Sequence, residues 1–492
     1  MPTPSLAFAS AWQLAGLVKR RKISATELLD FTIARIRAHN PVLNAVVVTR
    51  LPAARRQARA LDTLAARRGA SLGPLHGVPM TVKESFDVAG LPTTWGNASL
   101  KANIPKRHAL AVSRLEAAGA VILGKTNVPV NLADWQTYNP VYGTTNNPWD
   151  ISRTPGGSSG GSAAALAGGL TALELGSDIG ASIRDPAHYC GVYGHKPTFG
   201  IAARNGHARP GSYSFGDISV IGPLARSAFD LETALRVIAG PDAIDAAGWK
   251  LALPKAAKKS LKEFKVAVMT SAATAEVDGA IQEKIELLAR FLRKQGAKVS
   301  MTARPVDPAL AHQTFIMLLR AATSGQRSDR EHAALLAQRS SLEAQDAGLG
   351  ERDDYFTRQV LGNTLSHRDW LHWDNLRHQM RLQWAAFFGD YDLLLCPAAA
   401  TTAFAHNHVG ERWERMVLVN GKPQPSTTQM FWAGYSGMAY LPSTVAPIGL
   451  ADDGLPVGVQ IVGPQYGDLT CLKFAQLLER EYHAFVAPPG FA

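Results

Sequence analysis

The first part of the chain carries hydrophobic residues at helical spacing. The sequence Ser-Ala-Thr-Glu at residues 24–27 has the form of a capping box, in which the Ser24 hydroxyl accepts a first-turn N–H and Glu27 reaches back. Apolar residues then recur every three or four positions until the Asn-Pro pair at residues 40–41, where we expect the helix to end. A second helix, rich in Arg and Ala, is predicted over residues 53–68.

Short apolar runs between Gly and Pro residues replace this pattern after residue 75. Such runs are typical of buried strands. They lie at residues 77–82, 120–123, 171–175, 391–397 and 454–463. Helical stretches at 109–118 and 309–388, and a strand-helix-strand pattern over 264–299, alternate with them. Strands that alternate with helices indicate an α/β sheet.

Composition and charge narrow the function classes. The chain has 492 residues, 46% of them hydrophobic and 18% charged, which excludes a disordered chain and a small staple-dependent module. The net charge of +11 comes from short scattered basic clusters, and no zinc-finger or aromatic-basic pattern accompanies them. We therefore expect a protein that does not bind nucleic acid.

Three features bear on the compartment. The odd set of three cysteines, Cys190, Cys396 and Cys471, lies in apolar stretches and suits reduced core residues. Residues 1–12 lack the pattern of a secretory leader, and no run of apolar residues is long enough to span a membrane. We expect a soluble cytoplasmic protein without a membrane span, either as a single chain or as a homodimer.

A Gly- and Ser-rich tract at residues 155–162, Pro-Gly-Gly-Ser-Ser-Gly-Gly-Ser, is the strongest local signal. It is not a phosphate-binding Walker loop, because the required Gly-Lys-Ser/Thr ending is missing. It does fit the nucleophile elbow Gly-x-Ser-x-Gly with Ser159 at its centre, so an α/β-hydrolase that uses Ser159 with an Asp and a His is one alternative.

A second arrangement of residues predicts different chemistry. Ser182 follows a tight-turning segment, residues 176–181, that is able to aim several backbone N–H groups at one point, as an oxyanion requires. Lys83 ends a buried apolar run, and burial lowers the pKa of a lysine until it is able to act as a base. Ser158, beside Gly157, is placed to relay a proton between the two.

These segments resemble the amidase signature family, the serine-serine-lysine amidohydrolases. The resemblance rests on Gly-Val-Pro-Met-Thr-Val-Lys at 77–83 and on matching segments at 124–127, 147–150, 153–162, 176–180, 182–186, 190–192 and 194–198, with weaker likeness at 23–28 and 454–460. It implies a large single-domain α/β/α sandwich, with a central mixed, mostly parallel twisted sheet covered by helices on both faces. The single domain spans 1–492, with a signature core over 70–225, a variable helical region over 245–390, and C-terminal strands and a helix over 391–492 that complete the sheet.

The resemblance also assigns roles. Ser182 corresponds to the acylated nucleophile, Ser158 to the relay serine after a cis peptide bond from Gly157, and Lys83 to the general base. The oxyanion hole is expected from the backbone N–H groups of Ile179, Gly180, Ala181 and Ser182. The family needs no cofactor and no metal, and the chain has no His-Glu-x-x-His motif.

The sequence leaves two questions open near the nucleophile: the backbone conformation of Ala181, and whether Asp178 and Arg184 form a pair. The family has glycine where this chain has Ala181; alanine costs roughly 1 kcal/mol if φ is positive there, and only narrows the site if φ is negative. We expect activity to survive. Asp178 and Arg184 form either a buried pair that braces the loop or two ordinary surface charges.

The sequence gives little information about which substrate the protein binds. Segments that line the pocket by resemblance carry aromatic residues, and we expect them to bind small hydrophobic or aromatic amides, anilides, carbamates or esters. The expected substrate-binding residues are Trp135, Gln136, Tyr138, Phe315, Phe431 and Trp432. Two alternatives stay open: a glutamine-hydrolysing subunit of a tRNA-dependent amidotransferase, which suits the positive charge, and a non-catalytic binding protein on the same scaffold.

Overall fold

One large sheet organises the molecule. The structure, a computed structural model, describes residues 6–345 and 354–491. The predicted ranges 1–12, 1–492, 245–390, 309–388 and 391–492 therefore each include residues outside those described. Eleven strands in this part of the chain pair in the spatial order β1-β3-β2-β6-β8-β7-β14-β15-β11-β9-β10. Their bounds are β1 (Val46–Thr49), β2 (Pro79–Lys83), β3 (Val121–Thr126), β6 (Leu173–Asp178), β7 (Tyr193–Lys196), β8 (Val220–Ala225), β9 (Lys265–Val268), β10 (Lys298–Ser300), β11 (Leu393–Pro397), β14 (Ser443–Leu450) and β15 (Pro456–Val462). Two small hairpins lie outside this sheet: β4 (Tyr138–Asn139) with β5 (Gly143–Thr144), and β12 (Met416–Val419) with β13 (Lys422–Pro425).

The pairing is mixed. Parallel pairs join β3, β2 and β6 in one half of the sheet, and β11, β9 and β10 at its far end. The strands between these two groups, and edge strand β1, pair antiparallel. The predicted α/β fold on a large mixed sheet is confirmed, and the expected parallel pairing holds for these two groups but not for the centre of the sheet.

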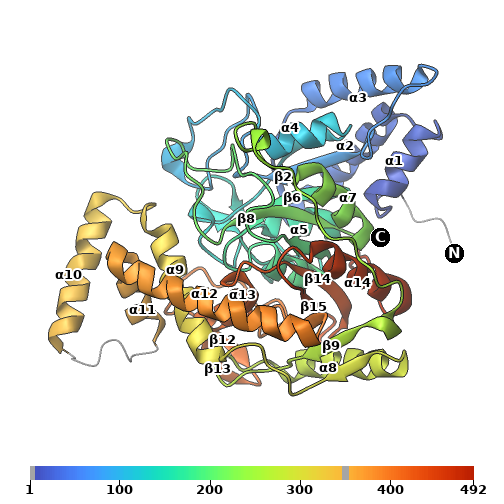
Figure 1. Cartoon of the computed structure of the whole chain (residues 1–492). Coiled ribbons are helices and arrows are strands. Elements are labelled where there is room, and N and C mark those ends of the chain that lie inside the picture. The colour runs from blue at the N-terminus through green and yellow to red at the C-terminus, as the bar shows by residue number, and fades with distance from the viewer. Residues whose placement is uncertain (1–5, 346–353, 492) are drawn as a thin grey trace.

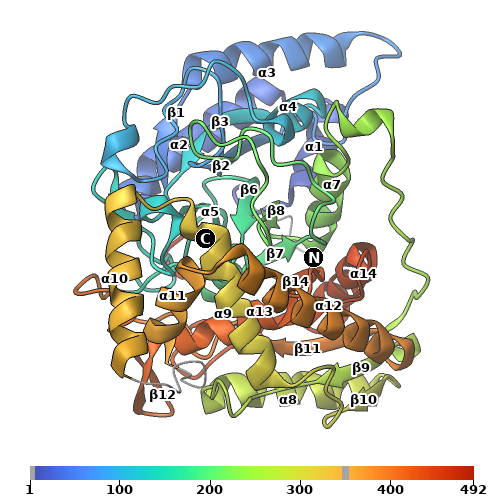
Figure 2. The ribbon, with the colours of Figure 1, turned by 60° about the vertical axis from the view of Figure 1, so that its left-hand side comes forward.

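Helices cover the sheet on both faces (Figures 1 and 2). The helices are α1 (Ala11–Lys19), α2 (Ala25–Leu43), α3 (Leu51–Ala66), α4 (Leu110–Ala117), α5 (Gly160–Ala167), α6 (Arg184–Cys190), α7 (Ala228–Ile238), α8 (Gly279–Lys294), α9 (Pro308–Ser324), α10 (Asp329–Gln345), α11 (Tyr355–Asn363), α12 (His367–Asp390), α13 (Met430–Gly437) and α14 (Asp468–Glu481). Figure 1 shows α9 to α12 gathered beside the sheet, away from the N-terminal helices.

Strand alternation assigns the two faces, because successive side chains point to opposite sides of a sheet. Leu224 and Val445 belong to a core cluster with residues of α5 and α6. Their neighbours Ala225 and Ala446 belong to the main core, which includes residues of α7, α8 and α14. The loop and helix that carry the Gly- and Ser-rich tract therefore lie on one defined face of the sheet.

Most predicted elements form close to their expected positions, and one boundary was wrong. The strand-helix-strand pattern over 264–299 is β9, α8 and β10, with the two strands parallel and adjacent. The capping box at Ser24 is present, but the helix does not end at residues 40–41: it continues through Pro41 to Leu43. A proline in the last turn removes one intrahelical hydrogen bond, and Asn44 then closes the helix in a left-handed conformation with its N–H on Asn40 O.

Two further expectations concern the three cysteines and the absence of a membrane-spanning helix. All three cysteines are buried and unpaired, as expected of reduced core residues. No helix in the described ranges has the length and apolar character needed to cross a bilayer.

Candidate active site

Lys83 lies at the end of β2 and points away from the main core. Met80 and Val82 pack into that core, so the period of the strand turns Thr81 and Lys83 to the opposite face, where α5 lies. The Lys83 side chain is fully buried. Because alternate side chains of a strand point to opposite faces of the sheet, the apolar run at residues 77–83 determines which face the Lys83 amine lies on.

The amine of Lys83 contacts two serines. Its Nζ lies 2.6 Å from Ser158 Oγ and 3.0 Å from Ser177 Oγ. Ser158 precedes α5, and the peptide bond between Gly157 and Ser158 is cis, as the family resemblance implied. Ser177 was not among the predicted site residues. It lies within residues 176–180, one of the segments that carry the family resemblance, and this position is the signal that could have identified it.

Burial lowers the pKa of Lys83 from its ordinary value to about 7, although the charges of Asp178 and Asp185 act in the opposite direction. A lysine with a pKa near 7 is substantially unprotonated at neutral pH. The amine is therefore able to accept a proton from the hydroxyl beside it.

Ser182 lies in the turn between β6 and α6, and its carbonyl accepts the N–H of Ser159 at 3.1 Å. Ser158 and Ser182 both line one cavity of about 910 Å³. Within the described ranges, the Ser182 hydroxyl forms no hydrogen bond. The structure thus brings Lys83 and Ser158 into direct contact and places Ser182 on the wall of the same cavity, with its hydroxyl unengaged.

The turn before Ser182 presents backbone donors. The N–H groups of Ile179, Gly180 and Ser182 have no acceptor in the described part of the chain, and all three residues line the cavity. The N–H of Ala181 differs, because it donates to Asp178 Oδ1 at 3.1 Å. Three of the four predicted oxyanion donors are therefore free, and the fourth holds the turn in place.

Ala181 has a φ of +81°, in the left-handed region. Alanine tolerates this region poorly because its Cβ approaches the following carbonyl oxygen. Of the two outcomes considered for this position, the structure shows the one that costs free energy.

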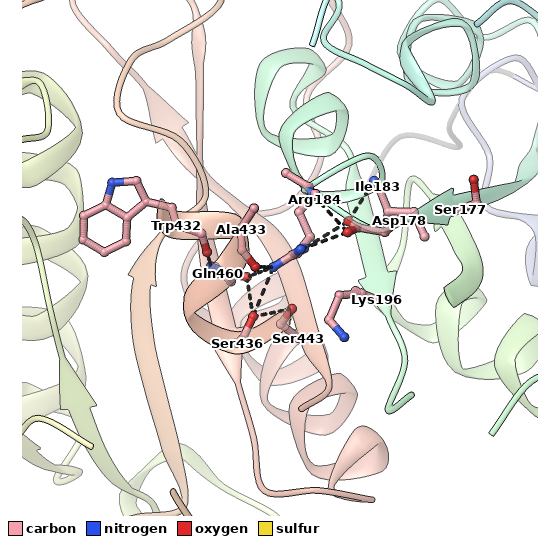
Figure 3. Close-up of polar contacts among 12 residues, drawn as sticks. Ser177, Asp178, Ile183, Arg184, Lys196, Trp432, Ala433, Ser436, Ser443 and Gln460 are labelled. Atoms are coloured by element: carbon pink, nitrogen blue, oxygen red, sulfur yellow. Dashed lines mark hydrogen bonds and ion pairs between the residues drawn. The ribbon is translucent and has the colours of Figure 1, made fainter. Parts of the chain in front are cut away.

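Asp178 and Arg184 form a buried pair, not two surface charges (Figure 3). Arg184 Nη2 donates to Asp178 Oδ1 at 2.9 Å and Nε to Oδ2 at 3.0 Å, the fork-to-fork geometry of a strong pair. Burial alone would raise the pKa of Asp178, but the Arg184 charge and hydrogen bonds and the Ile183 N–H hold it below its ordinary value.

The other end of Arg184 reaches the C-terminal part of the chain. Its Nη1 donates to Ala433 O at 2.9 Å, Ser436 Oγ at 3.1 Å and Gln460 Oε1 at 2.7 Å. Figure 3 shows this guanidinium between Asp178 and the elements that carry these acceptors. The turn that presents Ser182 is thereby tied to α13 and β15.

Two of the six predicted substrate-binding residues lie on the cavity wall, and four do not. Trp135 and Gln136 line the cavity, and Trp135 Nε1 donates to Gly180 O at 2.8 Å. Tyr138 is not on the cavity wall, and its hydroxyl accepts a hydrogen bond from Arg415 at 2.8 Å. The remaining three, Phe315, Phe431 and Trp432, are fully buried in the main core and are not on the cavity wall.

The alternative nucleophile is placed elsewhere. Ser159 is fully buried at the start of α5, its hydroxyl donates to Ser177 O at 3.4 Å, and it is not on the cavity wall. Two histidines that flank the signature are also structural: His188 accepts the Gly458 N–H at 2.8 Å, and His195 contacts Asp468 at 3.1 Å. In the described ranges, no group of three or more His, Cys, Asp or Glu side chains is arranged to hold a metal ion.

Replacing Arg184 by methionine is expected to destabilise the fold by about 3–5 kcal/mol, because it leaves the Asp178 carboxylate buried without its partner. The matched control is Arg236→Met, which removes an exposed helical pair with Glu232 and should change stability by less than about 0.5 kcal/mol. Urea unfolding of both variants measures the difference. Equal, small changes would contradict the bracing role.

Replacing Ala181 by glycine is expected to raise the free energy of unfolding by about 1 kcal/mol, because glycine adopts positive φ without strain. Ala187→Gly, at a buried position within α6, is the control and should lower stability by about 1 kcal/mol. Denaturant midpoints at unchanged m-values give both numbers. A loss of stability in the two variants alike would show that Ala181 is not strained.

Comparison with known proteins places this geometry in a family. The family model Amidase matches residues 27–472. The chain is 33% identical to the A subunit of glutamyl-tRNA(Gln) amidotransferase from Anaeromyxobacter dehalogenans, over 96% of both chains. It is 32% identical to the same subunit from Moorella thermoacetica, over 97% of this chain and 98% of the relative.

Solved structures show the same fold. A chain from a vestigial protein complex that bears on the origins of an s-triazine catabolic enzyme superposes with a TM-score of 0.81 at 28% identity, covering 97% of this chain and 100% of that one. A bacterial aryl acylamidase of the amidase signature family superposes with a TM-score of 0.79 at 27% identity, over 96% of each chain. The Lys-Ser contact, the turn that carries Ser182 and these matches agree, and the chain belongs to the amidase signature family.

Proposed function

We propose that this chain hydrolyses the C–N bond of a small amide through an acyl-enzyme on Ser182. The observation that carries the proposal is the 2.6 Å contact between the buried Lys83 amine and Ser158 Oγ, on the cavity that Ser182 lines. A shielded amine of lowered pKa is the base that a serine nucleophile requires.

The reaction proceeds in two balanced halves. Lys83 takes a proton from Ser158, which takes one from Ser182 as the Ser182 oxygen bonds to the acyl carbon. The free N–H groups of Ile179, Gly180 and Ser182 stabilise the oxyanion, and the C–N bond breaks as the proton returns through Ser158 to the leaving amine. Water then attacks the ester by the same route in reverse, releasing the acid and free Ser182.

The identity of the amide has two candidates. The expectation of a hydrophobic or aromatic amide loses part of its support, since Phe315, Phe431 and Trp432 lie in the core and only Trp135 remains on the wall as an aromatic side chain among the predicted residues. The 33% identity to the amidotransferase A subunit over nearly the whole chain favours the second candidate. In that case the chain hydrolyses glutamine and works with partner subunits on a glutamyl-tRNA.

Three variants test the shared chemistry. Ser182→Ala is expected to lower kcat by at least about 10⁴-fold, and Lys83→Met by about 10²–10⁴-fold, because the nucleophile and the base act as one unit. Ser159→Ala is the control and should keep wild-type activity. Amide hydrolysis is followed by release of ammonia from glutamine and of 4-nitroaniline from aryl amides.

The outcomes separate the alternatives. Loss of activity in Ser159→Ala with retention in Lys83→Met would replace the proposal by the α/β-hydrolase mechanism. Hydrolysis of aryl amides by the isolated chain, without partner subunits, ATP or tRNA, argues for a stand-alone amidase. Activity confined to glutamine argues for the role of an amidotransferase component.

The pH dependence follows from the pKa of Lys83. Because burial lowers this pKa to about 7, the amine is protonated and inactive below that pH, so kcat/KM should fall about tenfold for each pH unit below 7 and level off above it. A pH–rate profile from pH 5 to 10 measures this limb. A limb near pH 10 would indicate an ordinary solvated lysine and contradict the assigned base.

A further inference from the structure

The wall of the Ser182 cavity carries more positive than negative side chains. Its arginines are Arg204, Arg209, Arg320, Arg327, Arg412 and Arg415, and its carboxylates are Asp134, Asp178 and Glu331. Each carboxylate already has an arginine partner: Asp134 with Arg415 at 2.7 Å, Asp178 with Arg184 at 2.9 Å, and Glu331 with Arg327 at 3.7 Å. The remaining arginines give the cavity a positive potential that internal pairing does not cancel.

Arg320 stands out among these arginines. Only 6% of its surface is exposed, and its Nε is buried without a hydrogen-bond partner. Its guanidinium donates no hydrogen bond to any described residue, and its Cζ lies 5.6 Å from the centroid of the Tyr355 ring, a cation–π contact. By contrast, Arg204, Arg209 and Arg412 donate to backbone carbonyl oxygens.

The position of Arg320 relates it to the reacting centre. It lies on α9 directly after Leu319, whose Cδ2 is 3.9 Å from the point where a Cβ on Gly180 would sit. Gly180 belongs to the turn that presents Ser182. Arg320, Gly180 and Ser182 all line the same cavity, so one bound molecule is able to contact both the guanidinium and this turn.

The Nε donor of Arg320 is costly to bury, because it loses water without gaining an acceptor. Burial and the charges of Arg412 and Arg327 lower the pKa of Arg320 to about 10, so it remains protonated at neutral pH. The fold thus holds a permanent charge in the cavity without an internal counter-ion.

We infer that Arg320 binds a carboxylate of the substrate, so that the amide hydrolysed at Ser182 carries a free carboxylate elsewhere in the molecule. A carboxylate accepts two parallel N–H bonds from the planar guanidinium fork and supplies the missing counter-charge. The inference rests on the proposed amide hydrolysis and names its substrate class: monoamides of dicarboxylic acids and other small carboxylate-bearing amides.

Paired substrates test this assignment. The mono-4-nitroanilide of succinic acid carries the carboxylate in the acyl part, 4-acetamidobenzoate carries it in the leaving amine, and the methyl ester of each removes the charge. Wild-type enzyme is expected to show a kcat/KM about 10- to 100-fold higher for one acid than for its methyl ester.

Arg320→Gln should abolish this preference, lowering kcat/KM for the acid about 10- to 100-fold and leaving the methyl ester within about threefold. Arg320→Lys should keep part of the preference. Arg327→Gln is the matched control: Arg327 lines the same cavity but is paired with Glu331, and its loss should change neither substrate more than about threefold.

A binding measurement separates the two proposals. In Ser182→Ala, which cannot turn over, succinate should raise the melting temperature more than equimolar phosphate or neutral succinamide does, and this shift should vanish in the double variant with Arg320→Gln. Activity that depends on Ser182 without any preference for the acids, or equal losses on both substrates in Arg320→Gln, would overturn the carboxylate assignment alone. A preference that survives Arg320→Gln would also overturn it. Hydrolysis that survives Ser182→Ala would overturn the proposed function.

Discussion

The removal of one lysine amine from water is the constraint on which the rest of the site depends. Lys83 lies in the protein interior, with Ser158 and Ser177 as its side-chain partners. A buried amine stays uncharged only if no ionised carboxylate nearby holds a proton on it. Two carboxyl groups are close enough to do so, Asp178 and Asp185, and the fold handles each differently.

Asp178 is engaged by Arg184, and Asp185 is buried deeply enough to raise its pKa well above the ordinary range. The first carboxylate is ionised but its charge is matched by a guanidinium, and burial of the second favours its protonated form. Arg184 thus serves two needs at once. It fixes the turn that presents Ser182. It also pairs with the negative charge of Asp178, which would otherwise favour the protonated form of Lys83 more strongly.

Arg320 differs from Lys83 in how its surroundings balance its charge. Around Lys83 the fold matches the nearby charge internally, whereas at Arg320 a charge of similar burial has no carboxylate partner in the described residues. Arg320 and Ser182 line the same cavity, and a ligand of opposite charge there would supply the missing partner. The contrast between the two sites is the reason that the carboxylate assignment follows from this structure and not from the family alone.

The sequence determined the local parts of this protein. The run ending at Lys83, the capping box at Ser24 and the strand-helix-strand over 264–299 all depend on neighbours within a few residues, and their periods and caps were readable. The serine-serine-lysine set was predicted from the same kind of signal, because its members lie in dense local motifs.

Only the tertiary structure decided what depends on distant segments. The central strands β7, β8 and β14 were not predicted, because their pairing joins residues far apart in the chain. The burial of Phe315, Phe431 and Trp432 and the absence of a carboxylate partner for Arg320 likewise depend on contacts between distant segments. The left-handed φ of Ala181 occurs in the turn between β6 and α6, where its N–H donates to Asp178. The type of an aromatic or charged residue does not show whether its side chain lies in the core or on a cavity wall. Contacts between segments far apart in the chain determine that location.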